Sequence, residues 1–455
     1  RMACLDQRRE ELRALTGLFA SADDGMVQGA PGAASRLAPL SGCADTVVLL
    51  SRRRLERGTG SAEQLADLDA RNARARALNL TGRFDEAVAT AEAALADAHR
   101  LRSGVHELQL SIVLGVLYAN RGKVQEAERT LQDALALALR AGDDESTAAA
   151  LTVLSWIVGV RQGRAEDAEV WNRYAAAVIS RLREPALWEQ RRLKTLGRLR
   201  ITRGDYASAV AALSEAAKLG ERSSAVPDAD RAIVEEDLGF ALGLTGKVAE
   251  AGAHVRRAIE IEERVSGPKG PHVATTRTTL ASVLYREGKY AEAVSQLRLA
   301  GEVLERTVGE SRELGEVLDG LGTNLLALGD ASSALANHRR ASAMLMRTEG
   351  PKSAVAAHAI AAEGADLVAL GRAREAVPVL ERALAMQEAA KGEPVDLAET
   401  RASLAEAVWS VSRDRGRARK LAKQARATFA EAVARYGGGH EERRLREVEG
   451  WLGAH

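Results

Sequence analysis

The sequence predicts an all-α protein, built from about nine helical hairpins and closed by a C-terminal capping helix. One observation behind this prediction is the composition: only 3% of the 455 residues are aromatic and only nine are proline. Alanine, leucine, arginine and glutamate dominate instead, and all four favour helices. No stretch alternates β-branched and polar residues strictly, so we expect essentially no β-sheet.

The second observation is a repeat of nearly constant length. Glycine recurs at intervals of 40 to 42 residues between positions 82 and 371. Each of these glycines is expected to end the first helix of a hairpin, because helices commonly stop on a glycine in the left-handed conformation. A fixed period of this size is typical of a solenoid of helical hairpins. The turn glycines are Gly82, Gly122, Gly163, Gly204, Gly246, Gly288, Gly329 and Gly371.

Small residues mark the places where helices are expected to touch. Alanine follows every turn glycine after five and after twelve residues, as Ala127 and Ala134 follow Gly122. The two alanines are seven residues apart and therefore lie on one face of the second helix. Seven residues before the glycine, the first helix usually carries glycine or alanine, such as Gly115 or Gly239. These positions predict close helix–helix contacts, with leucines filling the space between them.

Two places break the pattern. In the third hairpin Trp156 occupies the small-residue position, and Gly159 and Asn172 stand where bulky residues are usual. We therefore expect an irregularity in the array between residues 150 and 190. Pro378 lies inside a predicted second helix and is expected to kink it, because proline lacks the amide hydrogen that the helix needs.

The periodic region divides the chain into three predicted parts. Residues 1–60 form an N-terminal helical segment and linker, with Leu12 and Leu15 on the apolar side of the first helix. Residues 61–436 form the hairpins, of which the ninth is degenerate. Residues 437–455 form the capping helix, with Val448 and Trp451 on one face and polar residues on the other, as the end of a solenoid requires.

The repeated phrase itself carries a family resemblance. LGVLYANRGKVQEA at residues 114–127 returns as LGRLRITRGDYASA at 196–209 and as LASVLYREGKYAEA at 280–293. With its turn glycine and paired alanines, this phrase resembles the tetratricopeptide repeat (TPR). Repeats of that family usually have 34 residues, and the longer period here resembles that of kinesin-light-chain-like TPR proteins. The resemblance implies a right-handed α-α superhelix that acts as a protein–protein interaction scaffold.

The opening of the chain carries a second resemblance. RMACLDQRREELRALT at residues 1–16, the Cys43-Ala44-Asp45 segment and an array ending in a Trp-Leu helix look like the C-terminal region of bacterial Hanks-type serine/threonine protein kinases. This implies a regulatory, partner-binding region in bacterial signal transduction, with the catalytic domain upstream of Arg1. Two alternatives stay open: the TPR sensor region of a bacterial ATP-dependent transcriptional regulator, and a stand-alone TPR adaptor.

Charge and motifs argue against several classes of function. The formal net charge is +1, from 64 basic and 63 acidic residues, which argues against a nucleic-acid or membrane-surface protein. The chain has no phosphate-binding glycine loop, no kinase loop motifs and no GxSxG elbow, so we predict no enzymatic activity and no cofactor. The histidines lack the spacing of a zinc site, so we predict no metal.

Cysteine usage suggests a compartment. Cysteine occurs only as Cys4 and Cys43, and two cysteines in so long a chain do not make a disulfide framework. We therefore expect two buried thiols in a reducing, cytoplasmic setting. No apolar run reaches the length of about 18 residues that a membrane span needs, so we expect no transmembrane helix.

The candidate binding site is a set of polar residues on successive first helices. Arg191, Lys194 and Arg198 are spaced i, i+3, i+7 and share one helix face. The family resemblance implies that first helices line a concave groove, which would suit an acidic or phosphorylated peptide. The alternative is that the cations form only a solvated helix face. The predicted site residues are Arg191, Lys194, Arg198, Glu236, Asp237, Thr278, Ser282, Tyr285 and Arg286.

Overall fold

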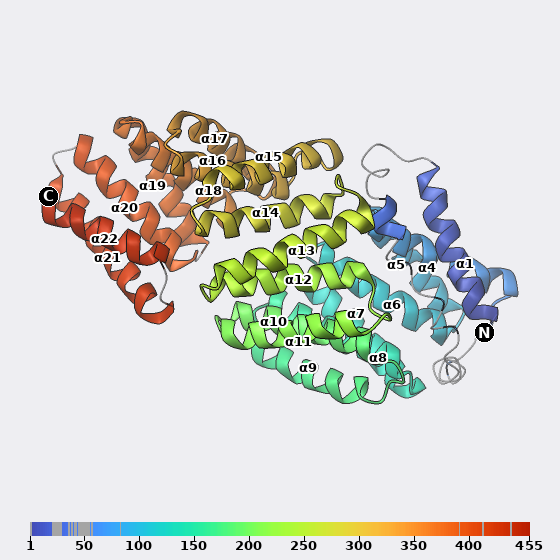
Figure 1. The fold of residues 1–455 in the computed structure, drawn as a ribbon. Coiled ribbons are helices and arrows are strands. Elements are labelled where there is room, and N and C mark those ends of the chain that lie inside the picture. The colour runs from blue at the N-terminus through green and yellow to red at the C-terminus, as the bar shows by residue number, and fades with distance from the viewer. Residues whose placement is uncertain are drawn as a thin grey trace. The chain divides into compact units, whose positions relative to one another are not determined.

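The structure is a computed structural model that describes residues 2–20, 30–34, 37, 40, 43, 55, 58–81, 83–390, 392–411, 414–436 and 439–455. In these residues all regular secondary structure is helical, which confirms the predicted fold class (Figure 1). The chain divides into two compact units, Arg1–Gly270 and Pro271–His455. The predicted boundaries at residues 60 and 436 stay predictions.

The first unit contains an N-terminal helix followed by five hairpins. The N-terminal helix packs against the first helix of the first hairpin. The helices are α1 (Met2–Phe19), α4 (Ala62–Leu80), α5 (Phe84–Arg100), α6 (Gly104–Asn120), α7 (Val124–Ala141), α8 (Asp144–Trp156) with the π-helical turn η3 (Ile157–Arg161), α9 (Ala165–Ile179), α10 (Ala186–Thr202), α11 (Tyr206–Arg222), α12 (Asp228–Leu244) and α13 (Val248–Ser266).

The second unit contains four hairpins and the final helix, so the described part of the chain has the nine predicted hairpins. The helix α19 continues through Pro378. The last helix packs on α21 and covers the end of the unit. The helices are α14 (Pro271–Arg286), α15 (Tyr290–Thr307), α16 (Arg312–Ala327), α17 (Ala331–Thr348), α18 (Ala354–Ala369), α19 (Ala373–Ala389), α20 (Pro394–Val411), α21 (Arg415–Tyr436) and α22 (Gly439–Ala454).

The alanine pattern becomes the contact surface between helices. Every alanine located five or twelve residues after a turn glycine, from Ala87 to Ala383, has 0% relative exposure. Where the first helix has glycine, a Cβ atom added to Gly115 would lie 2.5 Å from Cγ of Leu131, and one added to Gly197 would lie 2.5 Å from Cγ of Leu213. The two helices of a hairpin therefore approach too closely for any side chain at these positions, as predicted.

The turn glycines adopt the conformation expected of them. Gly82 lies outside the described residues, and the other seven have φ angles between 71° and 86°. A Cβ atom on any of these seven would meet nothing within 4 Å. Glycine is therefore required at these turns by the left-handed backbone and not by a lack of space.

The predicted irregularity in the third hairpin is the π-helical turn η3, which inserts an additional residue into the helix. The wider turn brings Gly159 to the close helix contact: a Cβ atom there would lie 2.6 Å from both Ala168 Cβ and Leu199 Cδ1. The interpretation of Gly159 as a lost bulky residue is therefore wrong, because it has taken over the small-residue role. Trp156 is only half-buried, and the Arg161 guanidinium lies 5.9 Å from its ring centre.

The expectation of two free thiols is also wrong. Cys4 of α1 forms a disulfide with Cys43, and their Cα atoms are 5.5 Å apart. Composition could not reveal this bond, because the two cysteines are 39 residues apart and only folding of the N-terminal segment brings them together. Disulfides persist in oxidising compartments and are rare in the cytosol. The bond therefore weighs against the cytoplasmic location expected from composition.

Candidate functional site

The first helices of the hairpins form a continuous layer in the first unit. Helix α4 contacts α6, and α6, α8, α10 and α12 contact one another in turn, whereas successive second helices make few contacts. A layer whose helices lie closer together is the inner layer of a curved array. We call the exposed side of these helices the first-helix face. Arg191, Lys194 and Arg198 lie on it, as do Glu236 and Asp237 of the next hairpin.

Aspartates of α12 neutralise both predicted arginines of α10. Arg191 donates from Nε and Nη2 to the two carboxylate oxygens of Asp230, each at 2.9 Å. Arg198 makes the same forked contact with Asp237, at 2.7 and 3.1 Å. Bidentate pairs of this kind are strong and directional, so they connect α10 to α12. The basic patch expected from the sequence is therefore largely compensated within the protein.

Lys194 lies between these two arginines on the same helix face. It is half-buried and forms no ion pair within the described part of the chain. Burial lowers the pKa of Lys194 from 10.5 to about 8, and the positive charge of Arg198 adds to this effect, while Asp230 and Asp237 oppose it. A nearby anion stabilises a partly desolvated ammonium group, so an acidic group of a ligand would stabilise the charged form of Lys194.

The first helix of the next hairpin, α12, carries different side chains at the positions equivalent to Lys194 and Arg198. Ten residues before the turn glycine, where α10 has Lys194, α12 has the half-buried Glu236. Six residues before it, where α10 has Arg198, α12 has Phe240, whose side chain is 45% exposed. The first-helix face therefore combines a cation, a carboxylate and an exposed aromatic ring. Phe240 is not among the residues predicted from the sequence, although its position relative to the turn glycine places it beside them.

The remaining predicted residues lie on α14, in the second unit. The hydroxyl groups of Thr278 and Ser282 donate to backbone carbonyls one turn earlier, at 3.1 and 3.2 Å, so they bond to their own helix. The Tyr285 ring centre lies 5.4 Å from that of Tyr290, and burial raises the pKa of the Tyr285 hydroxyl. Arg286 is exposed. By their spacing, these residues share one face of α14.

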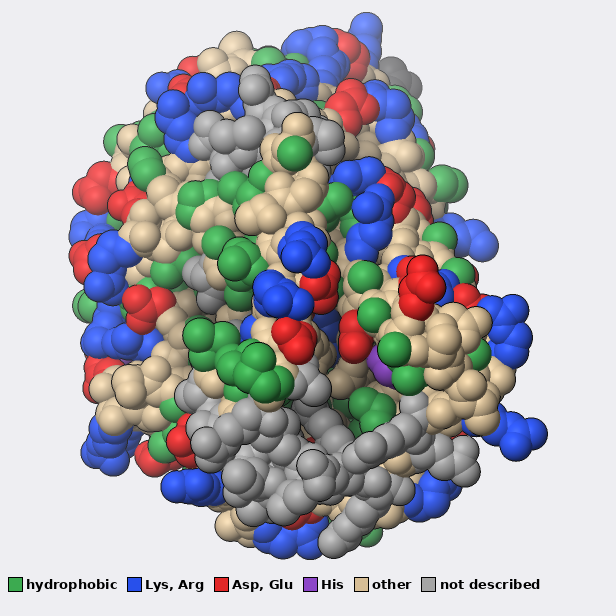
Figure 2. Space-filling model, turned by 90° about the vertical axis from the view of Figure 1, so that its right-hand side faces the viewer, with side chains coloured by type: hydrophobic (Ala, Val, Ile, Leu, Met, Phe, Trp, Pro, Cys, Tyr) green, Lys and Arg blue, Asp and Glu red, His purple; other side chains and the backbone are tan. Residues whose placement is uncertain are grey.

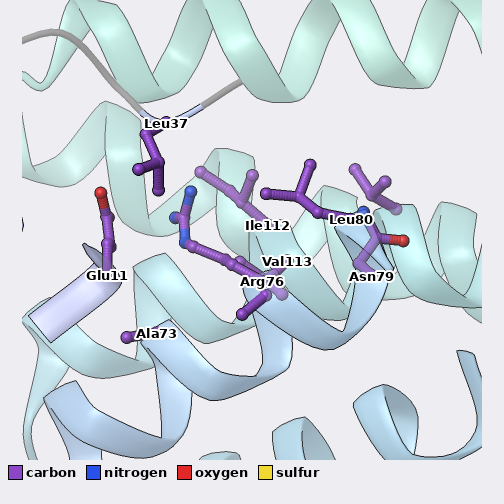
Figure 3. A pocket seen from close by; sticks show the side chains of 10 residues that line it. Glu11, Leu37, Ala73, Arg76, Asn79, Leu80, Ile112 and Val113 are labelled. Carbon is purple, nitrogen blue, oxygen red and sulfur yellow. The ribbon is translucent and has the colours of Figure 1, made fainter. Parts of the chain in front are cut away.

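A cavity of about 210 Å³ near the start of the first unit is a second candidate site (Figure 3). Most of its walls are aliphatic, and the Arg76 side chain extends from α4 toward Glu11 and Leu37 (Figure 3). Ile112 lies ten residues before its turn glycine, as Lys194 does. The cavity therefore lies on the first-helix face, at the place where α1 packs nearby. It is lined by Glu11, Leu37, Ala73, Arg76, Ala77, Asn79, Leu80, Ile112, Val113 and Val116.

The second unit buries an ionisable pair that the sequence analysis missed. His338 of α17 and Asp366 of α18 are 1% and 0% exposed, and Nδ1 and Oδ2 are 2.6 Å apart. The other ring nitrogen, Nε2, donates to the backbone carbonyl of Asp319 at 3.0 Å. Burial raises the pKa of Asp366. Burial opposes a charged His338, but the hydrogen bond to Asp366 and the charge of Asp319 outweigh it and raise the pKa of His338.

The same aspartate faces a second histidine. The carboxylate of Asp319 lies 3.7 Å from Nε2 of His358 on α18, and Asp396 of α20 lies 3.8 Å from Nδ1. Asp319 and then Asp396 raise the pKa of His358 to about 9. At neutral pH His358 is therefore a cation held between two carboxylates. Among the described residues, no group of three or more potential metal ligands is arranged to hold a metal ion.

The surface in Figure 2 shows lysine and arginine side chains lying among aspartates and glutamates. Charges of both signs alternate on this face, in keeping with the net charge of +1. No helix in the described part of the chain has both the length and the apolar character needed to cross a membrane.

Comparisons with known proteins identify the repeat. Residues 230–306 and 279–347 match the family model of the tetratricopeptide repeat. A search of curated proteins finds no significant relative. Among solved structures, a Rap protein complexed with competence and sporulation factor is similar, with 14% identity, a TM-score of 0.50 and coverage of 76% of this chain and 99% of that one. The apo form of RapI has 14% identity, a TM-score of 0.51 and coverage of 84% and 98%.

At these identities the solved structures show the fold alone. The matched residues contain α12 to α17 almost entirely, and the same hairpin with its turn glycine and buried alanines continues on both sides of them. The family match and the shared fold therefore agree with the repeat that the sequence predicts. Residues 230–347 therefore contain tetratricopeptide repeats.

Proposed function

We propose that this scaffold binds a peptide segment of a partner protein on the first-helix face of α10 and α12. The observation that carries the proposal is Lys194, a half-buried cation without an ion pair in the described residues, set between two arginines that are already paired. The segment would bring an acidic or phosphorylated side chain to Lys194 and an apolar side chain to the exposed ring of Phe240. Charge-assisted hydrogen bonding would fix its position.

Peptides selected on the full chain from a random library test this proposal. We expect the selected peptides to carry acidic residues, and we expect Lys194→Gln to weaken their binding by about ten- to a hundredfold, the range for one lost hydrogen bond to a charged group. The matched control is Lys218→Gln on α11, an exposed lysine of the same hairpin. Dissociation constants come from fluorescence anisotropy. Equal affinity for wild type and Lys194→Gln would refute the proposed site.

The same measurement has an expected pH dependence. Because the pKa of Lys194 is about 8, raising the pH above that value removes its charge, whereas a lysine at the ordinary value of 10.5 would stay charged. Binding of an acidic peptide should therefore weaken as the pH rises through 8, and Lys194→Gln should remove that trend.

We also propose that the chain belongs to the regulatory region of a bacterial serine/threonine protein kinase and recruits substrates or regulators to it. The support is the resemblance of residues 1–16, the Cys43-Ala44-Asp45 segment and the overall layout. The coding sequence upstream of Arg1 is expected to contain a glycine-rich loop, a His-Arg-Asp loop and an Asp-Phe-Gly motif. An ATPase domain upstream would favour the transcriptional-regulator alternative, and neither domain would favour a stand-alone adaptor.

A further inference from the structure

The helix α21 concentrates positive charge more than its surroundings do. Residues 415–430 contain six lysines and arginines and no acidic residue. Two of these six are engaged: the Arg415 guanidinium lies 3.8 Å from the ring centre of Trp409, and Arg417 forms an ion pair of 2.6 Å with Glu381. The other four are exposed and form no ion pair within the described part of the chain; they are Arg419, Lys420, Lys423 and Arg426.

Arginines on α17, another second helix of the same unit, form ion pairs. On α17, Arg339 pairs with Glu363 at 3.0 Å, Arg340 with Glu305 at 3.0 Å and Arg347 with Glu310 at 2.7 Å. Glu363 and Glu305 belong to the neighbouring hairpins, and Glu310 lies just before α16. Helix α21 packs against α20 and α22.

The carboxylates of α22 do not compensate α21. Glu447 pairs with Arg444, and Glu442 lies 3.9 Å from Arg446, so both carboxylates form ion pairs within α22. Arg444 also reaches Glu399 of α20 at 2.7 Å. Within the described residues, the four cations of α21 therefore have no carboxylate partners like those of the α17 arginines.

The four cations form a compact and accessible surface. Arg419, Lys423 and Arg426 follow i, i+4, i+7 spacing and extend over about 10 Å of helix, at 1.5 Å per residue. Arg419, Lys420 and Lys423 border a shallow hollow that Gly416, Gln424 and Ala427 also line. The opposite side of the helix is apolar and packs inward, with Ala425 and Phe429 at 0% exposure.

The side chains around this surface restrict what it can bind. Along residues 415–434 of α21 no large apolar side chain is exposed, whereas a helix that binds a membrane surface places such residues beside its cations. Phe429, the aromatic residue of this stretch, is buried and offers no ring on which a nucleic-acid base could stack. The ion pair from Arg417 to Glu381 places a carboxylate of α19 at the border of the patch. A narrow cationic strip of this kind suits an extended acidic chain.

We propose that Arg419, Lys420, Lys423 and Arg426 bind an acidic segment of a partner protein, a stretch rich in aspartate and glutamate. Carboxylates spaced along an extended chain would meet the ammonium and guanidinium groups along the helix. This site is separate from the one around Lys194, because it lies on α21 of the second unit and not on α10 of the first.

The test measures binding of a fluorescein-labelled polyglutamate peptide to the full chain by anisotropy. The variant replaces the four cations of α21 by glutamine, and the control replaces four paired arginines, Arg339, Arg340, Arg347 and Arg372, by glutamine. Both change the net charge equally. We expect the α21 variant to lose about tenfold or more in affinity at physiological ionic strength, and the control to lose less than about twofold, because charges more than a Debye length of about 8 Å from the bound peptide are largely screened.

The competing ligands provide the outcomes that would overturn the proposal. Equal losses in both variants would show that only net charge matters. Tighter binding of a DNA duplex or of phosphatidylserine vesicles than of polyglutamate, lost in the α21 variant, would assign the surface to nucleic acid or membrane. Polyglutamate is also titrated on Lys194→Gln: a larger loss of affinity there than in the α21 variant would assign the peptide to the first-helix face and overturn the α21 proposal.

Discussion

Replacing Asp366 by leucine is expected to destabilise the second unit by about 3–5 kcal/mol, the usual cost of removing one partner of a buried ion pair. Asp366 is fully buried and lies 2.6 Å from the His338 ring. His338 would keep a buried ring nitrogen without its acceptor. The expected result is loss of amide protection in α17 and α18 by hydrogen exchange, and a lower denaturation midpoint of the full chain.

The double variant His338→Leu, Asp366→Leu is expected to recover most of this loss. Other hairpins place an apolar residue at the position of His338, such as Leu131 or Leu380, and pack it against a small residue of the first helix. A leucine at 338 would pack against Gly322 in the same way. Replacing a buried pair by apolar residues is often neutral or stabilising. A double variant as unstable as the single one would contradict this account, as would an unaffected Asp366→Leu.

Gly239→Ala and Gly243→Ala, four residues apart on α12, are expected to have opposite effects. A Cβ atom on Gly239 would lie 2.4 Å from Cγ2 of Val255 and 2.9 Å from the backbone oxygen of Ala251. Backbone cannot move aside easily, so we expect a loss of about 1–3 kcal/mol from overpacking. A Cβ atom on Gly243 would meet only Ala251 Cβ, at an ordinary 3.9 Å.

Gly243→Ala should therefore stabilise α12 by about 0.5–1 kcal/mol, because alanine is the better helix former. Hydrogen exchange of peptides from α12 and α13 in the full chain measures both changes. If both variants weakened protection equally, the effect would come from helix propensity or solvation and not from the close approach of α12 and α13.

The repeat architecture could be predicted because its determinants are local and recur. A turn that needs a left-handed φ calls for glycine, and a close helix contact calls for alanine or glycine. The irregular third hairpin was also visible, as Trp156 in a small-residue position. The structural cause of the irregularity could not be predicted, because the π-helical turn that moves Gly159 into the contact depends on how α8 packs against α9 and α10.

The sequence by itself determined the all-α fold and the positions of the hairpin turns, and it predicted that Arg191, Lys194 and Arg198 share one helix face. Only the tertiary structure decided which of those charges stay available: Asp230 and Asp237, each 39 residues away, neutralise the two arginines and leave Lys194. It also decided the disulfide of Cys4 and the burial of Asp366. The physical reason is that helix periodicity is encoded in neighbouring residues, whereas the effective charge of a group depends on partners that only the folded chain brings within a few ångströms.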